Sequence, residues 1–191
     1  MFINLNLFIL SDIYHRDLKP ENILYTKDGI IKICDFGSSK TIEENTKSTP
    51  YIVSRYYRAP ELLLGCSNYT YSIDLFATGC IFAELFSLNP IFAGKTEGLQ
   101  LFEHMAILGK PDDSYFQKFK LPADMLNYFT NHMEKWAKQD LKPIINEFGN
   151  YNDRDIELAA DLIDKCLMYD WENRITAANA LKHPFFTDYT K

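Results

Sequence analysis

The chain has few of the features that mark nucleic-acid binders, disulfide scaffolds or membrane proteins. Acidic residues outnumber basic ones by 26 to 20 in 191 residues, so the net charge of −6 argues against a nucleic-acid binder. The four cysteines show neither CxxC pairing nor metal-ligand spacing, which predicts reduced thiols rather than disulfides. The apolar stretch 1–10 is too short to span a bilayer and has no basic flank like that of a signal peptide. We therefore expect a cytoplasmic or nuclear protein that binds neither nucleic acid nor membrane.

The composition is that of one folded domain. Hydrophobic residues make up 47% of the chain and charged residues 24%, and 14 Phe and 12 Tyr can fill a core. No internal repeat or low-complexity tract divides the sequence. We expect a single unit over residues 1–191.

A short β-hairpin is predicted near the start of the chain. Residues 22–25 and 30–34 have the apolar, β-branched character of strands, and an Asp-Gly pair lies in the four-residue connection between them. The hairpin would bring Asn22 and Asp35 together, because Asn22 begins its first strand and Asp35 directly follows its second.

The rest of the chain is predicted to be mainly helical. Residues 72–86 are apolar on every side, which indicates a buried helix with Ser72 as its N-cap. Further helices are expected over 96–108 and over 153–168. A last helix, capped by Thr176, is expected to run through Leu181. Residues 38–58 are polar and longer than an ordinary connection, which favours a functional loop.

Three short motifs point to one chemistry. Residues 15–22 read His-Arg-Asp-Leu-Lys-Pro-Glu-Asn, residues 35–37 read Asp-Phe-Gly, and residues 59–61 read Ala-Pro-Glu. Their order and spacing resemble the catalytic loop, metal loop and activation-segment anchor of eukaryotic protein kinases. The resemblance implies the C-terminal lobe of the protein kinase-like fold, with a catalytic loop at 14–22, an activation segment at 35–61 and a group-specific insert at about 112–150.

The resemblance implies serine/threonine kinase activity with ATP and Mg²⁺, and it assigns the residues that would carry it. Asp17 would accept the proton of the substrate hydroxyl, and Lys19 would contact the transferred phosphate. Asn22 and Asp35 would bind Mg²⁺ through oxygen atoms, as this ion prefers. Lys19, Asn22, Asp35 and Leu24 would form the nucleotide site. Supporting roles fall to His15, Phe36, Gly37, Glu61, Asp74 and Arg174.

Two of these supporting roles are specific. Asp74 corresponds to the family's carboxylate that holds the catalytic-loop backbone, and in so apolar a helix it needs hydrogen-bond donors such as backbone N–H groups. Arg174 corresponds to the family's ion-pair partner of Glu61. Phe76 stands where the family usually has Trp, which is a change between aromatic residues.

The stretch 50–61 resembles the group that contains cyclin-dependent, MAP and glycogen synthase kinases, and glycogen synthase kinase 3 is the most similar of these. That resemblance makes Tyr51 an activation-loop phosphorylation site. It also makes Arg16, Lys40, Arg55 and Arg58 a pocket for phosphate, on the activation loop or already present on a protein substrate. The Thr-Pro-Tyr at 49–51 departs from that family and resembles splicing-associated and dual-specificity kinases.

One part of the kinase pattern is not found. Residues 1–13 contain no Gly-rich loop and no lysine-bearing strand, so we expect the N-terminal lobe to be absent, with Leu24 and Phe36 exposed on an apolar patch. Two functions remain open. The chain is the catalytic part of a serine/threonine kinase, or it is a non-catalytic module that docks a scaffold protein at the helix 96–108.

Overall fold

The computed structural model describes most of the chain, namely Met1, Ser11, Leu121, Asp124, Asn127 and residues 13–41, 55–119, 136–149 and 151–187. The strands are β1 (Ile13–Tyr14), β2 (Ile23–Tyr25), β3 (Ile31–Ile33) and β4 (Lys40–Thr41). The helices are α2 (Pro60–Leu63), α3 (Ser72–Ser87), α4 (Glu97–Leu108), α5 (Asp113–Gln117), α7 (Leu141–Ile145), α8 (Asp153–Cys166), α9 (Ala177–Ala180) and α10 (Pro184–Thr187). Short 3₁₀ helices cover Pro20–Asn22, Phe36–Ser38 and Arg55–Tyr57.

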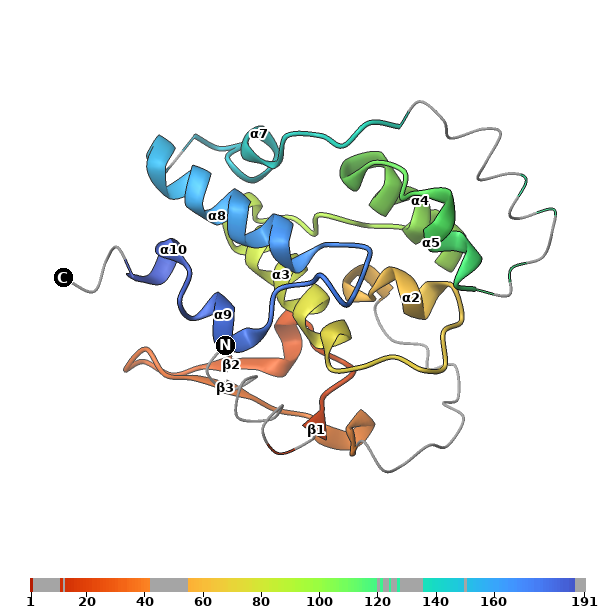
Figure 1. Cartoon of the computed structure of the whole chain (residues 1–191). Helices are drawn as coiled ribbons and strands as arrows, with labels where there is room; N and C mark the ends of the chain where they lie inside the picture. Colours follow the sequence, from red (N-terminus) through yellow and green to blue (C-terminus); the bar gives the residue numbers. More distant parts are fainter. Residues whose placement is uncertain are drawn as a thin grey trace.

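The helices form one body, and the β-strands lie along its lower side (Figure 1). The central helix α3 runs through that body and packs against α8, while α4 and α5 lie on the opposite side from α9 and α10. None of the described helices is long and apolar enough to cross a membrane. The fold is therefore mainly α with a small β element, as the sequence predicted.

The predicted hairpin is present. β2 and β3 pair antiparallel, with Ile23 opposite Ile33 and Tyr25 opposite Ile31. Gly29 adopts φ of +80° in the turn and donates to the carbonyl of Thr26 at 3.0 Å, a conformation that glycine adopts without strain. A second pair, β1 with β4, was not predicted, because two-residue strands leave too little pattern in the sequence.

The core lies where α3 meets α8. Leu75 and Phe76 of α3 are fully buried, as are Ile163 and Cys166 of α8. A Cβ atom on Gly79 would lie 2.6 Å from that of Cys166, so the close approach of the two helices depends on this glycine. Burial raises the pKa of the Cys166 thiol to about 12, which keeps it protonated and unreactive.

The helix boundaries correct several predictions. Ser72 is not the N-cap of α3, because Tyr71 precedes the helix and the Ser72 hydroxyl hydrogen-bonds to Thr70 Oγ1 at 2.8 Å instead. Thr96 caps α4 and Thr176 caps α9, each accepting a backbone N–H. The helix α9 is not the last, since α10 follows. The short helices α5 and α7 lie within the stretch 112–150 that the sequence left without assigned elements.

Candidate active site

The loop after β1 is held by one buried carboxylate of the helical body. Asp74, in the first turn of α3, accepts the backbone N–H of His15 at 2.7 Å and that of Arg16 at 2.9 Å. Arg16 has φ of +69°, a left-handed conformation that is strained for a residue with a side chain. Burial raises the pKa of Asp74, and the two N–H donors oppose that rise. The contact expected for Asp74 is present, and it stabilises a strained turn.

His15 connects this loop to the hairpin. Its ring Nε2 lies 2.9 Å from the carbonyl oxygen of Cys34, and its Nδ1 lies 3.4 Å from the backbone N of Asp17. Since a carbonyl only accepts and a backbone N–H only donates, the ring is the neutral tautomer with its proton on Nε2. The ring also packs edge-on against Phe36, with centroids 5.1 Å apart. His15 thus positions the residue before Asp35 relative to Asp17.

Asp17, Lys19 and Asn22 share one small network. Lys19 Nζ lies 3.0 Å from Asp17 Oδ2, and Asn22 Nδ2 donates to Asp17 Oδ2 at 3.3 Å and to its carbonyl at 2.8 Å. Both donors use Oδ2, and within the described part of the chain no partner is found for Oδ1 of Asp17. That oxygen is available to accept a hydroxyl proton from a substrate.

Asn22 and Asp35 lie at the same end of the hairpin. Asn22 directly precedes β2 and Asp35 follows β3 after one residue, and Cys34 N donates to the carbonyl of Asn22 at 2.9 Å. Asp35 has φ of +63°, and its Oδ1 accepts the N–H of Gly37 at 3.3 Å. The prediction that the hairpin brings these two residues together is confirmed for the backbone.

The donor set fits a magnesium ion that is bound together with phosphate. Among the described residues there is no group of three or more His, Cys, Asp or Glu that could hold a metal by themselves. Mg²⁺ in phosphoryl-transfer sites uses one or two protein ligands and fills its other positions with phosphate oxygens and water. Asn22 and Asp35 can supply those protein ligands, because Asn22 uses its amide nitrogen on Asp17 and leaves its oxygen for a cation.

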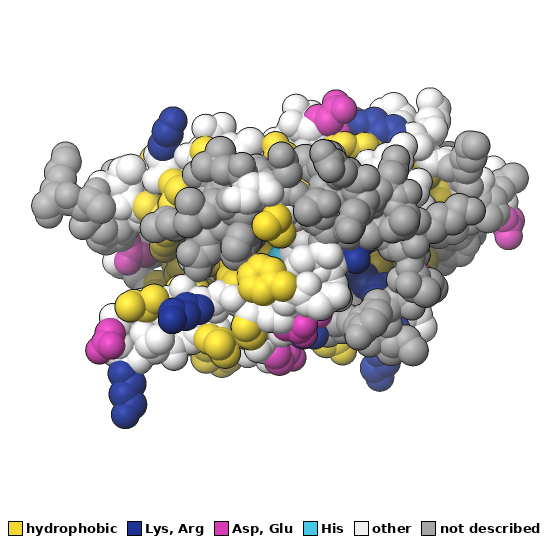
Figure 2. Space-filling model, turned by 90° about the horizontal axis from the view of Figure 1, so that it is seen from below, with side chains coloured by type: hydrophobic (Ala, Val, Ile, Leu, Met, Phe, Trp, Pro, Cys, Tyr) yellow, Lys and Arg dark blue, Asp and Glu magenta, His cyan; other side chains and the backbone are white. Residues whose placement is uncertain are grey.

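The hairpin also carries exposed apolar side chains. Leu24 is 51% exposed and Phe36 is 44% exposed, as the sequence predicted, and three neighbours share this exposure: Tyr25, Ile30 and Ile31. Figure 2 shows hydrophobic side chains on the underside of the molecule, with basic and acidic side chains beside them. We call these five residues the hairpin patch.

The basic residues predicted to bind phosphate have separate partners in the described part of the chain. Arg16 donates to the carbonyl of Ser38 at 2.5 Å and to the hydroxyl of Tyr69 at 2.8 Å. Arg55 donates to the carbonyl of Lys95 at 2.7 Å. Arg58 forms an ion pair with Glu97 at 2.9 Å. The two later arginines therefore contact the start of α4 and the residue before its cap, while Arg16 contacts the 3₁₀ helix Phe36–Ser38 and the segment before α3.

The side chains of two predicted site residues lie outside the described part of the chain. Tyr51 lies outside the described residues, and so does the side chain of Lys40, whose backbone forms β4. Their predicted roles stay predictions.

The Ala-Pro-Glu motif at the start of α2 is fixed by a buried ion pair. Arg174 contacts Glu61 at two points, 2.8 Å from Nη1 to Oε1 and 3.0 Å from Nη2 to Oε2, and both side chains are fully buried. Arg174 also donates to the carbonyls of Ser72 and Met168 and lies over the ring of Phe76 at 5.1 Å. The expected pairing of Glu61 with Arg174 is present, and Phe76 occupies an aromatic position beneath it.

Some buried polar residues of the helical body were missed from the sequence. Gln100 and His104 are both fully buried on the inner side of α4. Tyr57 donates to Glu84 at 2.7 Å, and burial together with this hydrogen bond raises its pKa. Gln100 and His104 stand four residues apart on an otherwise apolar helix face, and that pattern could have indicated a buried polar pair.

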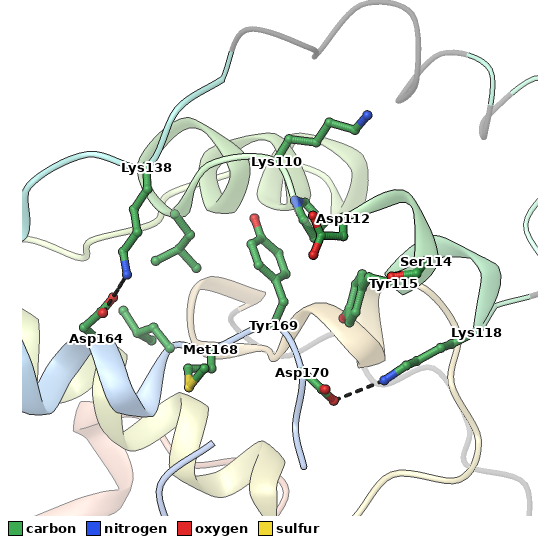
Figure 3. Close-up of a pocket in the computed structure, with 13 residues that line it drawn as sticks. Lys110, Asp112, Ser114, Tyr115, Lys118, Lys138, Asp164, Met168, Tyr169 and Asp170 are labelled. Carbon is green, nitrogen blue, oxygen red and sulfur yellow. Dashed lines mark hydrogen bonds and ion pairs between the residues drawn. The ribbon is translucent and has the colours of Figure 1, made fainter. Parts of the chain in front are cut away.

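A cavity of roughly 340 Å³ lies apart from these residues. It is bordered by α5, the end of α4, the segment before α7 and the chain after α8, and the ion pairs Lys138–Asp164 and Lys118–Asp170 stand on either side of it (Figure 3). None of the residues predicted for the site lines it.

The fold and the site together define a class of protein. A mainly helical body holds, on a short hairpin and the loop before it, the group of Asp17, Lys19, Asn22 and Asp35, and this is the C-terminal lobe of the protein kinase-like fold. A comparison with known families agrees, since residues 5–186 match the protein kinase domain. The chain belongs to the protein kinase domain family.

Similar proteins come from two branches of that family. "Protein kinase gsk3" of Schizosaccharomyces pombe is 39% identical over 180 residues, which are 93% of this chain and 43% of the relative. "Mitogen-activated protein kinase homolog NTF6" of Nicotiana tabacum is 38% identical over 175 residues, 92% of this chain and 45% of the relative. "Glycogen synthase kinase 1" of Pyricularia oryzae is 41% identical over 177 residues, 92% of this chain and 42% of the relative. The chain thus spans less than half the length of these relatives.

Proposed function

We propose that the chain is the catalytic part of a serine/threonine protein kinase of the glycogen synthase kinase type. It transfers the γ-phosphate of ATP to serine and threonine hydroxyl groups of protein substrates. The observation that carries the proposal is the joint placement of Asp17, Lys19 and Asn22 in one hydrogen-bonded network, at the hairpin end that also carries Asp35.

Each residue then has one task in phosphoryl transfer. Asp17 Oδ1 accepts the proton of the substrate hydroxyl and orients its oxygen, while Lys19 and Asn22 hold Oδ2. Lys19 has a mobile ammonium group that can turn from Asp17 to the transferred phosphate. Asn22 and Asp35 hold the metal, and Mg²⁺, when bound, neutralises charge on the phosphate oxygens. Leu24 supplies an apolar surface for the nucleotide base.

Substrate choice and regulation are part of the same proposal. Arg16 and Lys40 bind a phosphate that a protein substrate already carries, and Tyr51 is phosphorylated within the activation segment. Arg55 and Arg58 follow Tyr51 closely in the sequence, and guanidinium groups form strong paired contacts with phosphate. Residues 35–40 read Asp-Phe-Gly-Ser-Ser-Lys, which resembles the metal loop of glycogen synthase kinase 3 and supports this branch of the family.

Activity measurements test the proposal. The 191-residue chain should phosphorylate a serine peptide no faster than its Asp17→Asn variant, because residues 1–13 supply no Gly-rich loop and no lysine for the phosphates. In a fusion that adds a kinase N-terminal lobe before these residues, activity should appear. There Asp17→Asn should lower the rate about 10²–10⁴-fold, as loss of a general base does.

A matched control is available on the same hairpin. Asp28 lies in its turn, at the end away from Asp35, so Asp28→Asn makes the same chemical change and should leave the rate unchanged. A fusion whose activity survives Asp17→Asn would contradict the proposed role of this network.

The second candidate is a docking module that performs no catalysis. The specific observation in its favour is Leu99, which is 47% exposed on α4, where the sequence predicted a scaffold surface. A module of that kind does not require Asp17, Lys19, Asn22 and Asp35 together. A fusion that remains inactive, in which a Leu99 substitution abolishes binding of a scaffold protein, would favour this alternative.

A further inference from the structure

Two buried polar residues of α4 have no part in the phosphoryl-transfer network. Gln100 and His104 are both fully buried, one helical turn apart on the side that faces the core. A polar side chain in such a place is costly unless it finds hydrogen-bond partners. The partners of these two residues indicate what they do.

One amide group joins three segments of the chain. Gln100 Oε1 accepts the backbone N–H of Gly94 at 2.8 Å, and Gln100 Nε2 donates to the backbone carbonyl of Tyr56 at 3.0 Å. Position 94 has to be glycine for this approach, since a Cβ atom there would lie 2.2 Å from the backbone nitrogen of Gln100. The side chain of Gln100 thus fastens both the end of the activation segment and the loop before α4 to the helix.

His104 determines which way that amide points. Its Nε2 lies 3.3 Å from Gln100 Nε2, and because an amide nitrogen can only donate, the histidine nitrogen is the acceptor. The ring is therefore neutral with its proton on Nδ1, and burial, reinforced by Arg174, lowers the pKa of His104 to about 3. Phe76 and Phe92 hold the ring in place, with centroids 5.1 and 4.4 Å away.

This arrangement has an energetic cost, because among the described residues it leaves one hydrogen-bond donor of His104 without a partner. In the described part of the chain Nδ1 of His104 is buried and has no partner. A leucine of similar size would avoid that loss but could not accept the second N–H of Gln100. The histidine therefore orients Gln100 in a way that an apolar residue could not.

The segment that Gln100 holds is short, and side chains fix it at other points as well: Tyr57 is buried and donates to Glu84 at 2.7 Å. Arg55 and Arg58 reach the carbonyl of Lys95 and the carboxylate of Glu97, and both of these contacts are exposed. The bond from Gln100 to the Tyr56 carbonyl is a more protected contact with the backbone itself. Residues 55–58 lead directly into the Ala-Pro-Glu anchor and form part of the floor on which, by the proposed function, a substrate peptide lies.

We propose that Gln100 and His104 are positioning residues for the protein substrate. By holding the Tyr56 carbonyl and the Gly94 N–H in one arrangement, they keep residues 55–58 in the conformation that accepts a serine- or threonine-containing peptide. This inference rests on the proposed function, because it concerns the substrate of that same site.

The test uses the full 191-residue chain and two measurements. Backbone hydrogen exchange measures how firmly Gln100 holds these two segments. The Gly94 N–H donates directly to Gln100, and the Arg58 N–H donates to the carbonyl of Arg55 at 3.1 Å in the turn beside Tyr56. NMR titration with a synthetic peptide mixture containing one fixed serine reports substrate affinity. Gln100→Met should speed exchange at both amides and weaken peptide binding about tenfold, because the competent conformation becomes less populated.

Substitutions at position 104 separate positioning from packing. His104→Leu should reproduce the loss of peptide affinity, whereas His104→Gln, which retains an acceptor, should restore most of it. Glu103→Gln, on the exposed side of the same helix, is the control and should change neither measurement. A general packing defect would lower the stability of both position-104 variants and would weaken their peptide binding equally.

The outcomes distinguish this inference from the proposed function. A parent chain that binds no serine peptide, together with an inactive two-lobe fusion, contradicts the proposed function and the substrate role of the pair with it. A parent that binds the peptide, with Gln100→Met and His104→Leu variants that bind it equally well, contradicts the inference alone. Faster exchange at Gly94 and Arg58 with weaker peptide binding supports it.

Discussion

The hairpin of β2 and β3 and the helix pair α3 and α8 are both rich in apolar residues, but they differ in how much of this apolar surface is exposed to solvent. The helices bury nearly all of theirs, and Leu75 and Ile163 are not exposed at all. The hairpin exposes the five residues of the hairpin patch. Among the described residues three non-glycine residues have positive φ: Arg16 and Asp35 lie on the hairpin side, and Leu88 ends α3 in the helical body. The helical body supplies stability, and the hairpin side holds the reactive groups.

Asp74 shows how the two regions are coupled. It belongs to the buried central helix, yet both hydrogen bonds of its carboxylate go to the strained loop that carries Asp17. Strain of this kind persists only where the surrounding structure enforces it. The difference between the regions therefore suggests that reactive geometry is maintained by anchors in the helical body rather than by packing within the hairpin.

The largest expected effect comes from breaking an ion pair of the helical body. Arg174→Met leaves the Glu61 carboxylate buried without its partner, and this should lower the free energy of unfolding by about 3–5 kcal/mol. Chemical denaturation followed by circular dichroism measures the change.

The matched control removes the stranded charge. In the double variant Glu61→Gln with Arg174→Met no buried carboxylate is left unpaired, so a large part of the lost stability should return. If the parent and the Arg174→Met chain were equally stable, the buried ion pair would not contribute to stability, and the helical body would not have the stabilising role that the comparison assigns to it.

The extent of prediction from sequence differed between the two regions as well. The hairpin followed from local signals, namely Asp-Gly in its turn and apolar residues on its strands. The long helices α3, α4 and α8 followed from periodicity and composition. Ser72 was wrongly assigned as a cap, because Thr70 competes for its hydroxyl, and this contact depends on how the preceding loop folds. The strands β1 and β4 meet across a long stretch of chain, and no local pattern marks such a pair.

The site showed the same limit. Asp17, Asn22 and Asp35 could be placed from motif and hairpin, since they are close in sequence. The partners of Arg55 and Arg58 could not, because Lys95, just before α4, and Glu97, its first residue, come close to the two arginines only in the folded chain. Gln100 and His104 were missed for the same reason, although two polar residues on an apolar helix face were a usable signal.

An intermediate effect is expected from pH, and it belongs to the helical body alone. In the unfolded chain a histidine has a pKa of about 6.5, whereas burial lowers the pKa of His104 to about 3 in the folded chain. As the pH falls below the higher value, the unfolded state takes up a proton that the folded state does not. Stability should therefore fall by about 2 kcal/mol between about pH 7.5 and pH 5 on account of this residue.

The His104→Gln variant isolates that contribution. It has no titrating ring. The decrease in its unfolding free energy over the same pH interval should therefore be smaller than that of the parent, and the difference between the two decreases should be about 2 kcal/mol. Denaturation curves of the parent and the variant at the two pH values give the comparison. Parallel pH dependence of the two chains would show that His104 is accessible to protons in the folded state.

The smallest effect on stability is expected on the hairpin, where it tests the other side of the comparison. Ile30 is 54% exposed and belongs to the hairpin patch, so Ile30→Lys removes apolar surface from water without opening a cavity. Exposed substitutions of this kind usually change stability by less than about 0.5 kcal/mol. Exposed apolar patches promote association, so the variant should also scatter less light at high concentration than the parent.

Ile33 follows closely in the same hairpin but is buried, and Ile33→Ala should cost about 2–5 kcal/mol. If Ile30→Lys were as destabilising as Ile33→Ala, the hairpin patch would be part of the core, and the contrast between a stabilising helical body and an exposed reactive hairpin would not hold.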